Sequence, residues 1–340
     1  MKSDNLYESL NKCPVCYSIE RKIQYKNIED TIFLIPGKWV LYRCQSCNIL
    51  YLDPRYAKNY IYLAYRNYYT HNIKLLHNTD SKVSNKYFKE SLDNAYINWR
   101  FCTQYNNVNS LGILINILRF SKRKKINQKY RYLPRSGRKG RLLDVGVGNG
   151  DFLRRAIDAG WDVTGVDVDP QCVDTAKSYG LNVHLGGIEV FAGRTNIFDC
   201  ITMNHVIEHT HYPKQAIELA YNLLKTNGML WIETPNIDSF GHIKFGSFWR
   251  GIEVPRHLVL FSWDSLTSLL KDIGFRYIIK KPIYTAYNSM AAKSKAISQG
   301  KNPYYNLKSI SEKKSISLFI AIMTLLNPKR SEFISIKAYK

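Results

Sequence analysis

From Arg141 the chain alternates between short apolar runs and amphipathic segments, and this rhythm constrains the fold most. The run "RLLDV" (141–145) predicts a buried strand, and "DFLRRAIDAG" (151–160) predicts a helix that ends at a glycine. A second strand, a second helix and a third strand follow within residues 162–185. Strands that alternate with helices in this way form parallel sheets with helices on their faces. The pattern therefore predicts a doubly wound α/β domain.

The turn between the first strand and the first helix has the composition of a ligand-binding loop. Asp144 opens the string Asp-x-Gly-x-Gly-x-Gly, and glycines let the backbone approach a ligand closely. The second strand ends in another acid, Asp167, which is placed to accept hydrogen bonds from two ribose hydroxyls. Because the first acid precedes the glycines, we expect a nucleoside ligand with an amino-acid portion and no pyrophosphate.

The string "NHVIEH" (204–209) contains the H-x-x-E-H pattern of one group of zinc peptidases. For that activity we expect the pattern within a long helix, whereas here it directly follows "IFDCITM" (197–203), the predicted fourth strand. We therefore expect no metal at this string. Ligands of open α/β sheets bind outside the carboxyl ends of the strands, so Asn204 and His205 are expected at the catalytic position.

Histidine is the side chain best suited to accept a proton near neutral pH, which makes His205 the first candidate for a catalytic base. His257 is the second candidate. Glu208 and His209 are further catalytic candidates, although they alternatively only cap and brace the entry to the next helix.

Residues 236–262 form a long insertion after the fifth predicted strand, and we expect this insertion to form a lid over the acceptor. Aromatic side chains stack on sugars and rings, and arginines bind phosphate or carboxylate groups. The alternative is that the aromatic residues only pack the lid. The candidate acceptor-binding residues are Trp249, Arg250 and Arg256.

Four of the seven cysteines form two C-x-x-C pairs that are separated by 27 residues. These are Cys13, Cys16, Cys44 and Cys47. In a reducing compartment such pairs indicate tetrahedral zinc, and four thiolates leave no open position, so we expect a structural ion. The intervening stretches "TIFLI" (31–35) and "WVLYRC" (39–44) are predicted as the strands of a zinc ribbon.

The net charge of +22 is unevenly distributed along the chain. Residues 1–140 carry 25 Lys/Arg against 9 Asp/Glu, residues 141–275 carry 11 against 16, and residues 276–340 carry 13 against 2. Basic flanks favour an anionic partner, such as a phosphate-bearing substrate, a membrane surface or a nucleic acid. The alternative is solvated surface lysine in a proteome that is rich in this residue.

Two apolar runs lie beside basic residues, "LGILINILRF" (111–120) and "SLFIAIMTLL" (317–326). Each is too short to span a membrane, which needs about 20 residues. Each is either a helix packed on its own domain, which we favour, or an interfacial helix on an anionic membrane.

The amino-terminal residues lack the apolar stretch of a signal peptide, so we expect a cytoplasmic protein. Peripheral contact at the inner face of the membrane is a further hypothesis.

The chain resembles the class I S-adenosylmethionine-dependent methyltransferases, and most closely a bacterial group with a zinc ribbon ahead of that domain. The resemblance covers roughly residues 13–55 and 130–280. Its motifs are "LLDVGVGNG", "GVDVDP", "FDCITMNHVIEHTHYP", "LLKTNGMLWIETPN" and "VPRHLVLFS". It implies a Rossmann-like seven-stranded sheet whose last strand, here "SEFISIKAY" (331–339), is antiparallel.

The resemblance also implies roles for individual residues around S-adenosylmethionine. Residues 144–150 would line the methionine moiety, Asp167 would hold the ribose, and Val168 with residues 187–188 would flank the adenine. The implied cofactor-binding residues are Asp144, Gly146, Gly148, Asn149, Gly150, Asp167, Val168, Gly187, Ile188 and Asn204.

The expected organisation is a zinc ribbon (1–56), a helical linker or cap (57–135) and a methyltransferase domain (136–340) with a basic insertion (281–331). The expected acceptor is a small molecule or glycan, such as a phosphate-bearing sugar of cell-surface polysaccharide or secondary-metabolite synthesis. One alternative is a ribosomal or transfer RNA methyltransferase, although the Asn-Pro-Pro-Tyr motif usual in base-amine methylation is replaced by residues 204–207. Another is a non-catalytic zinc-ribbon binding protein. The sequence does not define the oligomeric state.

Overall fold

A computed structural model of the protein describes residues 5–66, 83–135, 140–281, 283, 286–304 and 314–340. The chain divides into two compact units. The first unit combines residues 1–68, 203–221 and 232–340, and the second combines residues 69–202 and 222–231. The domain boundaries expected from the sequence remain predictions.

The predicted α/β sheet is present, with seven strands in the order β12-β13-β10-β9-β6-β7-β8. Its strands are β6 (Arg141–Val145), β7 (Asp162–Asp167), β8 (Val183–Leu185), β9 (Phe198–Asn204), β10 (Leu224–Pro235), β12 (Tyr277–Lys280) and β13 (Phe333–Tyr339). Strands β6, β7 and β8 are parallel, and the last strand, β13, pairs antiparallel with β12. The sequence prediction of a Rossmann-like sheet with an antiparallel last strand is therefore confirmed.

Helices connect these strands. They are α4 (Asp151–Asp158), α5 (Pro170–Ser178), η3 (Ile188–Phe191), η4 (Ile207–His209), α6 (Pro213–Leu223) and α8 (Trp263–Ile273). Of these, α4 and α5 lie where the sequence predicts helices. Asp169 caps α5 by accepting a hydrogen bond from the Gln171 amide, and Pro170 occupies the first turn, where its missing N–H costs nothing. A capping box of Ser262 and Ser265 begins α8. Local sequence signals therefore position the helices.

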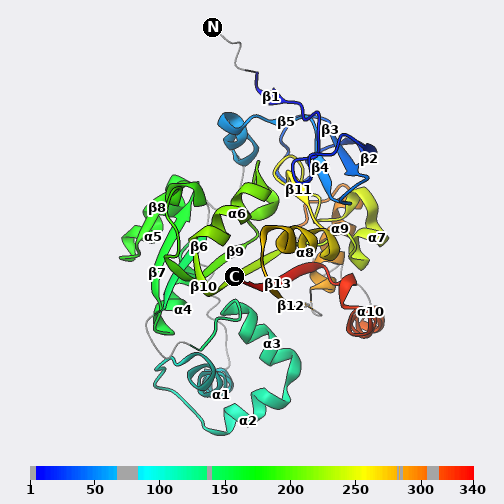
Figure 1. Ribbon diagram of the computed structural model, residues 1–340. Coiled ribbons are helices and arrows are strands. Elements are labelled where there is room, and N and C mark those ends of the chain that lie inside the picture. The colour runs from blue at the N-terminus through cyan, green and yellow to red at the C-terminus, as the bar shows by residue number, and fades with distance from the viewer. Residues whose placement is uncertain (1–4, 67–82, 136–139, 282, 284–285, 305–313) are drawn as a thin grey trace. The chain divides into compact units, whose positions relative to one another are not determined.

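A second sheet, of four antiparallel strands, carries the cysteine module. Its strands are β2 (Arg21–Ile28), β3 (Trp39–Cys44), β4 (Leu50–Leu52) and β11 (Val259–Leu260), in the order β11-β4-β3-β2. The strand β11 belongs to the predicted lid, and its Val259 lies opposite Tyr51 of β4. Figure 1 shows β11 beside the blue strands of the module. The lid therefore completes the sheet of the cysteine module. A short pair of strands, β1 (Tyr7–Glu8) and β5 (Arg55–Tyr56), lies beside it.

The prediction of a strand at "TIFLI" (31–35) is wrong, because residues 31–33 form a turn and residues 34–35 belong to no strand. The first long strand of the module is β2. Asp30 explains the turn. Its carboxylate accepts hydrogen bonds from the backbone N–H groups of Ile32, Phe33 and Ile35, which a ladder of strands would otherwise use.

The same carboxylate binds Arg256 of the lid from both oxygens, at 2.8 and 2.9 Å. The Arg256 guanidinium also donates to the Ala64 carbonyl and to Glu253, and its side chain is 0% exposed. A buried bidentate pair of this kind fixes both its partners in orientation. Arg256 therefore joins the lid to the turn that precedes β3.

The lid and the segment after it contain α7 (Phe240–Phe245), η5 (Gly246–Phe248), α9 (Tyr287–Ser298), α10 (Lys314–Leu326) and η7 (Pro328–Arg330). Glu332, just before β13, binds this region: it accepts hydrogen bonds from the Gly241 amide and from Nε1 of Trp249. Burial raises the pKa of Glu332 to about 7, against these hydrogen bonds, which favour the ionised form. The basic insertion is described only in part, because residues 282, 284–285 and 305–313 lie outside the described residues.

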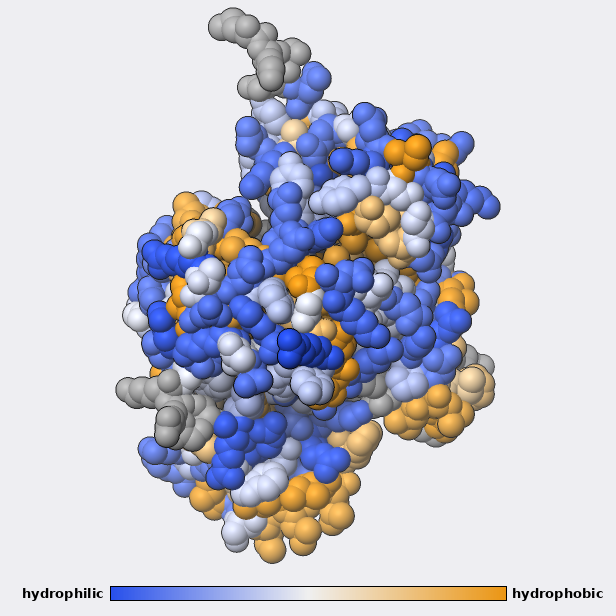
Figure 2. Space-filling model, in the orientation of Figure 1, coloured by the Kyte–Doolittle hydropathy of each residue, from blue (hydrophilic) through white to orange (hydrophobic). Residues whose placement is uncertain are grey.

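Helices α1 (Val83–Phe101), α2 (Leu111–Leu118) and α3 (Phe120–Lys129) lie together in the second unit (Figure 1), and η1 (Lys58–Tyr65) belongs to the first. Leu111, Leu114 and Leu118 of α2 are exposed, and Figure 2 shows apolar surface over this helix. Figure 2 also shows apolar surface over α10, where Phe319 and Leu326 are exposed. Within the described residues no helix is long and apolar enough to cross a membrane. Surface contact with a membrane remains a prediction.

We expect the Asp30–Arg256 pair to be essential for stability. Asp30→Ala leaves a buried guanidinium without its main counter-charge, which costs about 3–5 kcal/mol of unfolding free energy. Urea denaturation measures the loss. The control is Lys329→Ala, which removes an exposed ion pair to Asp264 and should cost less than about 1 kcal/mol. Equal effects of the two substitutions would contradict this account.

Glu332 predicts a pH dependence of stability. Its folded pKa of about 7 lies above the ordinary value of 4.5, so the folded protein holds a proton that the unfolded chain has lost. The stabilisation of the fold by this proton is complete below pH 4.5 and is lost as the pH rises to 7. The difference in unfolding free energy amounts to about 3 kcal/mol. We expect Glu332→Gln to flatten the stability profile between these pH values. The exposed-face variant Glu218→Gln should keep the wild-type slope, and a wild-type slope in Glu332→Gln would refute the assignment.

Candidate functional site

The glycine loop of the second unit rests on a buried acid. Asp144 is 0% exposed. Its Oδ1 accepts a hydrogen bond from Thr202 at 2.8 Å and forms an ion pair with Arg131. Burial raises the pKa of Asp144 to about 6, although Arg131 opposes this shift. The other carboxylate oxygen, Oδ2, is buried without a hydrogen-bond partner among the described residues. A ligand ammonium, as in the amino-acid portion of S-adenosylmethionine, suits such an acceptor.

Asp167 fixes the loop from the neighbouring strand. Its Oδ2 accepts from the Gly148 amide at 2.8 Å and its Oδ1 from the Asp169 amide at 3.0 Å. Gly148 has φ +56°, and a Cβ there would meet nothing within 4 Å, so open space adjoins the backbone. Burial raises the pKa of Asp167, while these amides favour its charge. The carboxylate keeps further lone pairs, so the loop fits a nucleoside that carries ribose hydroxyls.

The other predicted cofactor residues differ in exposure. Gly146 and Gly150 also have positive φ angles, of +77° and +78°. Val168 is 75% exposed after β7, whereas Ile188 is buried at the start of η3. The remaining ones, Asn149, Gly187 and Asn204, are half-buried or exposed at the loop, before η3 and at the end of β9. Their contacts with a cofactor remain predictions.

The first unit contains a cavity of about 260 Å³, which we call the acceptor cavity. Several predicted catalytic residues line it together with residues of β10, α9 and β13. The lining residues are His205, His209, Pro235, Arg250, Gly251, Glu253, His257, Met290, Lys293 and Phe333. The structure therefore brings together His205, His209, His257 and Arg250, which lie up to 52 positions apart in the sequence.

His205 has an unusual backbone conformation at the wall of this cavity. Its φ is +53°, a left-handed value that few residues other than glycine adopt, and its amide donates to the Glu233 carbonyl at 2.8 Å. Its Nδ1 lies 3.1 Å from Oε1 of Glu208, and the side chain is 38% exposed. Burial lowers the pKa of His205, but Glu208 more than offsets this and raises it. A carboxylate thus orients the imidazole, as in bases that accept a proton.

Glu208 is fully buried. Its Oε2 accepts a hydrogen bond from Thr234 at 2.9 Å, and its backbone carbonyl accepts from the Leu258 amide. Although burial raises the pKa of Glu208, His205 and the neighbouring histidines lower it to about 2. The Glu208 carboxylate thus contacts the cavity histidine His205, and its predicted catalytic role remains a prediction beside the alternative that it only braces the helix entry.

His257 and His209 stack edge to face with ring centroids 4.7 Å apart. His257 is buried, and its Nδ1 lies 2.7 Å from the Gly251 carbonyl oxygen. Burial lowers the pKa of His257 to about 4. Nδ1 of His209 lies 3.1 Å from the Arg256 carbonyl oxygen and 2.9 Å from the hydroxyl of Tyr65. Both imidazoles are thus held through one ring nitrogen by backbone carbonyls.

Charged side chains of the lid and of α9 line the cavity. Arg250 forms an ion pair with Glu253 and donates to the hydroxyl of Tyr304. Burial works against the charge of Arg250, but Glu253 and Tyr304 keep its pKa above the ordinary value. Burial, with Arg250 nearby, lowers the pKa of Lys293. The cavity wall therefore carries two basic side chains suited to an anionic group.

Two predicted acceptor-binding residues have structural contacts instead. The Arg256 guanidinium is engaged by Asp30, Glu253 and Ala64, so its donors do not face the acceptor cavity. Trp249 is 1% exposed and donates to Glu332, which agrees with the alternative that it packs the lid. These contacts are the structural role of both side chains in the described residues, and acceptor binding by either one remains a prediction.

Sequence reasoning missed three residues of these sites. Arg131 has no motif, yet it pairs with Asp144 and lies over the ring of Phe152 at 3.7 Å. Glu253 has a positive φ of +38°, and Lys293 comes from a helix in the basic stretch. For these residues the sequence offers one signal, the Arg-x-x-Glu spacing of Arg250 and Glu253, which permits an ion pair between them.

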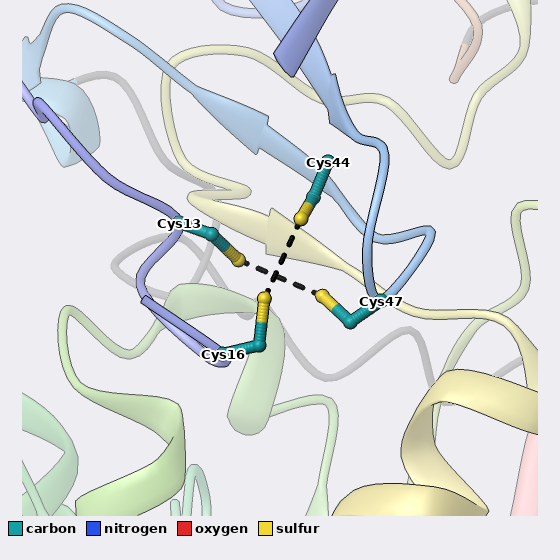
Figure 3. Close-up of side chains that lie close together, drawn as sticks. All are labelled: Cys13, Cys16, Cys44 and Cys47. Carbon is teal, nitrogen blue, oxygen red and sulfur yellow. Dashed lines mark hydrogen bonds between the residues drawn. The ribbon is translucent and has the colours of Figure 1, made fainter. Parts of the chain in front are cut away.

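The four cysteines of the ribbon converge (Figure 3). Sγ atoms of Cys13 and Cys47 lie 3.6 Å apart, and those of Cys16 and Cys44 lie 3.5 Å apart. Zinc with sulfur at ~2.3 Å in a tetrahedron separates its ligands by ~3.8 Å, so the arrangement fits this ion. If zinc binds here, all four ligands would be cysteine thiolates, which is typical of a structural ion.

The fold and the glycine loop agree with a class I S-adenosylmethionine-dependent methyltransferase domain. The family described as "Methyltransferase domain" matches residues 118–279. The protein resembles uncharacterized protein MJ1123 of Methanocaldococcus jannaschii, with 28% identity over 149 residues that cover 44% of this chain and 68% of that protein. It is also 32% identical over 103 residues to ubiquinone biosynthesis O-methyltransferase of Xanthomonas oryzae. The matched region covers 28% of this chain and 43% of that relative.

Among solved structures, a SAM-dependent methyltransferase from Archaeoglobus fulgidus matches with a TM-score of 0.44 and 19% identity, over 66% of this chain and 94% of that one. The chain spans less than half the length of the ubiquinone enzymes that it matches.

Asp167→Ala should weaken S-adenosylmethionine binding about 10- to 100-fold, because two ribose hydroxyls lose a charged acceptor. Isothermal titration calorimetry measures this change. Asp162→Ala is the matched control, since Asp162 lies on the same strand with 63% of its side chain exposed, and it should bind as wild type does. Unchanged affinity in Asp167→Ala would contradict the assigned role, and absence of binding by wild type would support the non-catalytic alternative.

Proposed function

We propose that this protein transfers the methyl group of S-adenosylmethionine to an oxygen of a small-molecule or glycan-type acceptor that carries an anionic group. The observation that carries the proposal is the acceptor cavity, in which a carboxylate-oriented histidine shares a wall with Arg250 and Lys293. The match to an O-methyltransferase supports oxygen as the acceptor atom.

The residues have separate roles in this proposal. Asp144, Asp167 and the glycine loop hold the cofactor, which supplies a methyl group on a positively charged sulfur. Arg250 and Lys293 hold the anionic group of the acceptor in the cavity. Holding a nucleophile in line contributes much of the acceleration in such transfers. His205 accepts the hydroxyl proton on its second ring nitrogen, while Glu208 stabilises the resulting imidazolium.

A phosphate-bearing sugar combines the hydroxyls and the anionic group that this cavity suits. RNA methylation is the second candidate, favoured by the net charge of +22 and by the ribbon. However, the ribbon pairs its sheet with β11 and its Asp30 with Arg256, so packing against the lid already accounts for its presence. We therefore favour the small acceptor.

Transfer of a labelled methyl group tests this choice. The protein is incubated with methyl-labelled S-adenosylmethionine and a cell extract that is separated afterwards into RNA, lipid-linked and small-molecule fractions. We expect label in the lipid-linked or small-molecule fraction. Label confined to RNA would overturn the proposal, and salt-insensitive weak RNA binding would argue against the RNA candidate.

His205→Ala should abolish this transfer, with a loss of about 100-fold or more for a missing base. Its affinity for S-adenosylmethionine should stay near that of wild type, because the cofactor residues are unchanged. Calorimetry and the labelling assay measure the two properties on the same preparation. Full transfer activity in His205→Ala would remove this residue from the mechanism.

A further inference from the structure

We propose that Glu208, His209 and His257 bind a divalent transition-metal ion at the acceptor cavity. One ligand atom from each of these residues lies within 4.8 Å of the other two. Glu208 and His257 are buried, and His209 is half-buried at the cavity wall. The cluster contains no cysteine, and its members come from η4 and from the lid, outside the thiolate site of the ribbon.

The hydrogen bonds of the two histidines leave the right nitrogen for a metal. A carbonyl oxygen only accepts, so Nδ1 of His257 donates its proton to the Gly251 carbonyl. Nδ1 of His209 likewise donates to the Arg256 carbonyl and shares this proton with the hydroxyl oxygen of Tyr65, 2.9 Å away. In the neutral ring Nε2 then carries the lone pair. Ligating histidines usually donate their other nitrogen to a carbonyl or carboxylate in this way, which fixes the tautomer and ring orientation.

Glu208 supplies a negative charge that the protein does not fully balance. Among the described residues its ion-pair partner is the imidazole of His205, with no arginine or lysine within ion-pair distance. Glu253, a carboxylate that lines the cavity, differs because Arg250 and Arg256 both pair with it. A buried carboxylate needs a counter-charge, and a bound cation provides one.

Two imidazoles and one carboxylate suit a first-row ion such as Mn²⁺, Fe²⁺, Co²⁺ or Zn²⁺. Three protein ligands would leave further positions on the ion, at which an acceptor oxygen could bind. This role rests on the proposed function: a bound ion lowers the pKa of an acceptor hydroxyl and so eases loss of its proton to His205. The site itself revises our expectation that "NHVIEH" holds no metal, because its Glu208 and His209 meet His257 from a distant segment.

Manganese binding tests the site, since Mn²⁺ prefers nitrogen and oxygen ligands to the thiolates of the ribbon. Full-length protein with its ribbon loaded with zinc is titrated with Mn²⁺, and loss of the free-ion electron paramagnetic resonance signal reports binding. We expect one strong site in wild type. We expect His257→Ala and the isosteric Glu208→Gln each to weaken it at least about tenfold.

The matched control is His242→Ala. His242 is also buried, with its Nδ1 against the Ile237 carbonyl, but it lies outside the cluster and should leave Mn²⁺ affinity unchanged. Circular dichroism and S-adenosylmethionine affinity confirm that each variant is folded. Absence of Mn²⁺ binding by folded wild type, or equal affinity in Glu208→Gln, would overturn the proposal. Neither outcome depends on methyl transfer, so the proposed function would stand or fall separately.

Discussion

The buried pair between Asp30 and Arg256 is the interaction on which the first unit depends. Asp30 organises its own turn through three backbone amides and simultaneously binds the lid arginine through both oxygens. Because Arg256 and His257 are adjacent, the same bond fixes a histidine of the acceptor cavity. The strand β11 follows at once and completes the ribbon sheet. The cysteine module is therefore joined to the segment that carries His257 of the acceptor cavity.

The cavity itself holds opposing charges at close range. Glu253 is balanced by two arginines, and although burial raises its pKa, they keep this pKa well below the ordinary value. Glu208 pairs with His205 and accepts a hydrogen bond from Thr234, and no arginine or lysine pairs with it in the described part of the chain. This asymmetry separates a structural carboxylate from one available for chemistry, either as the partner of His205 or as a metal ligand. Positive φ angles at His205 and Glu253 show where the backbone is strained to achieve this arrangement.

Much of this fold was predictable from local sequence. Alternating apolar runs, the Asp-x-Gly-x-Gly-x-Gly string and the paired cysteines each depend on residues close in the chain, and the sheet and the cysteine cluster follow them. Contacts between distant segments were not predictable. Arg256 carries the same sequence signal whether it binds an acceptor or Asp30, 226 positions away. The turn at "TIFLI" likewise depends on a side chain, Asp30, that overrides strand propensity.

Hydrogen exchange with and without zinc tests most directly whether the ribbon builds the acceptor cavity. Removing zinc should unfold β2, β3 and β4, because their ends are held by the thiolates. The account predicts that amide protection is then lost in residues 250–260 as well, while residues 141–167 of the second unit keep theirs. Protection of residues 250–260 that survives loss of zinc and melting of β2 to β4 would contradict it.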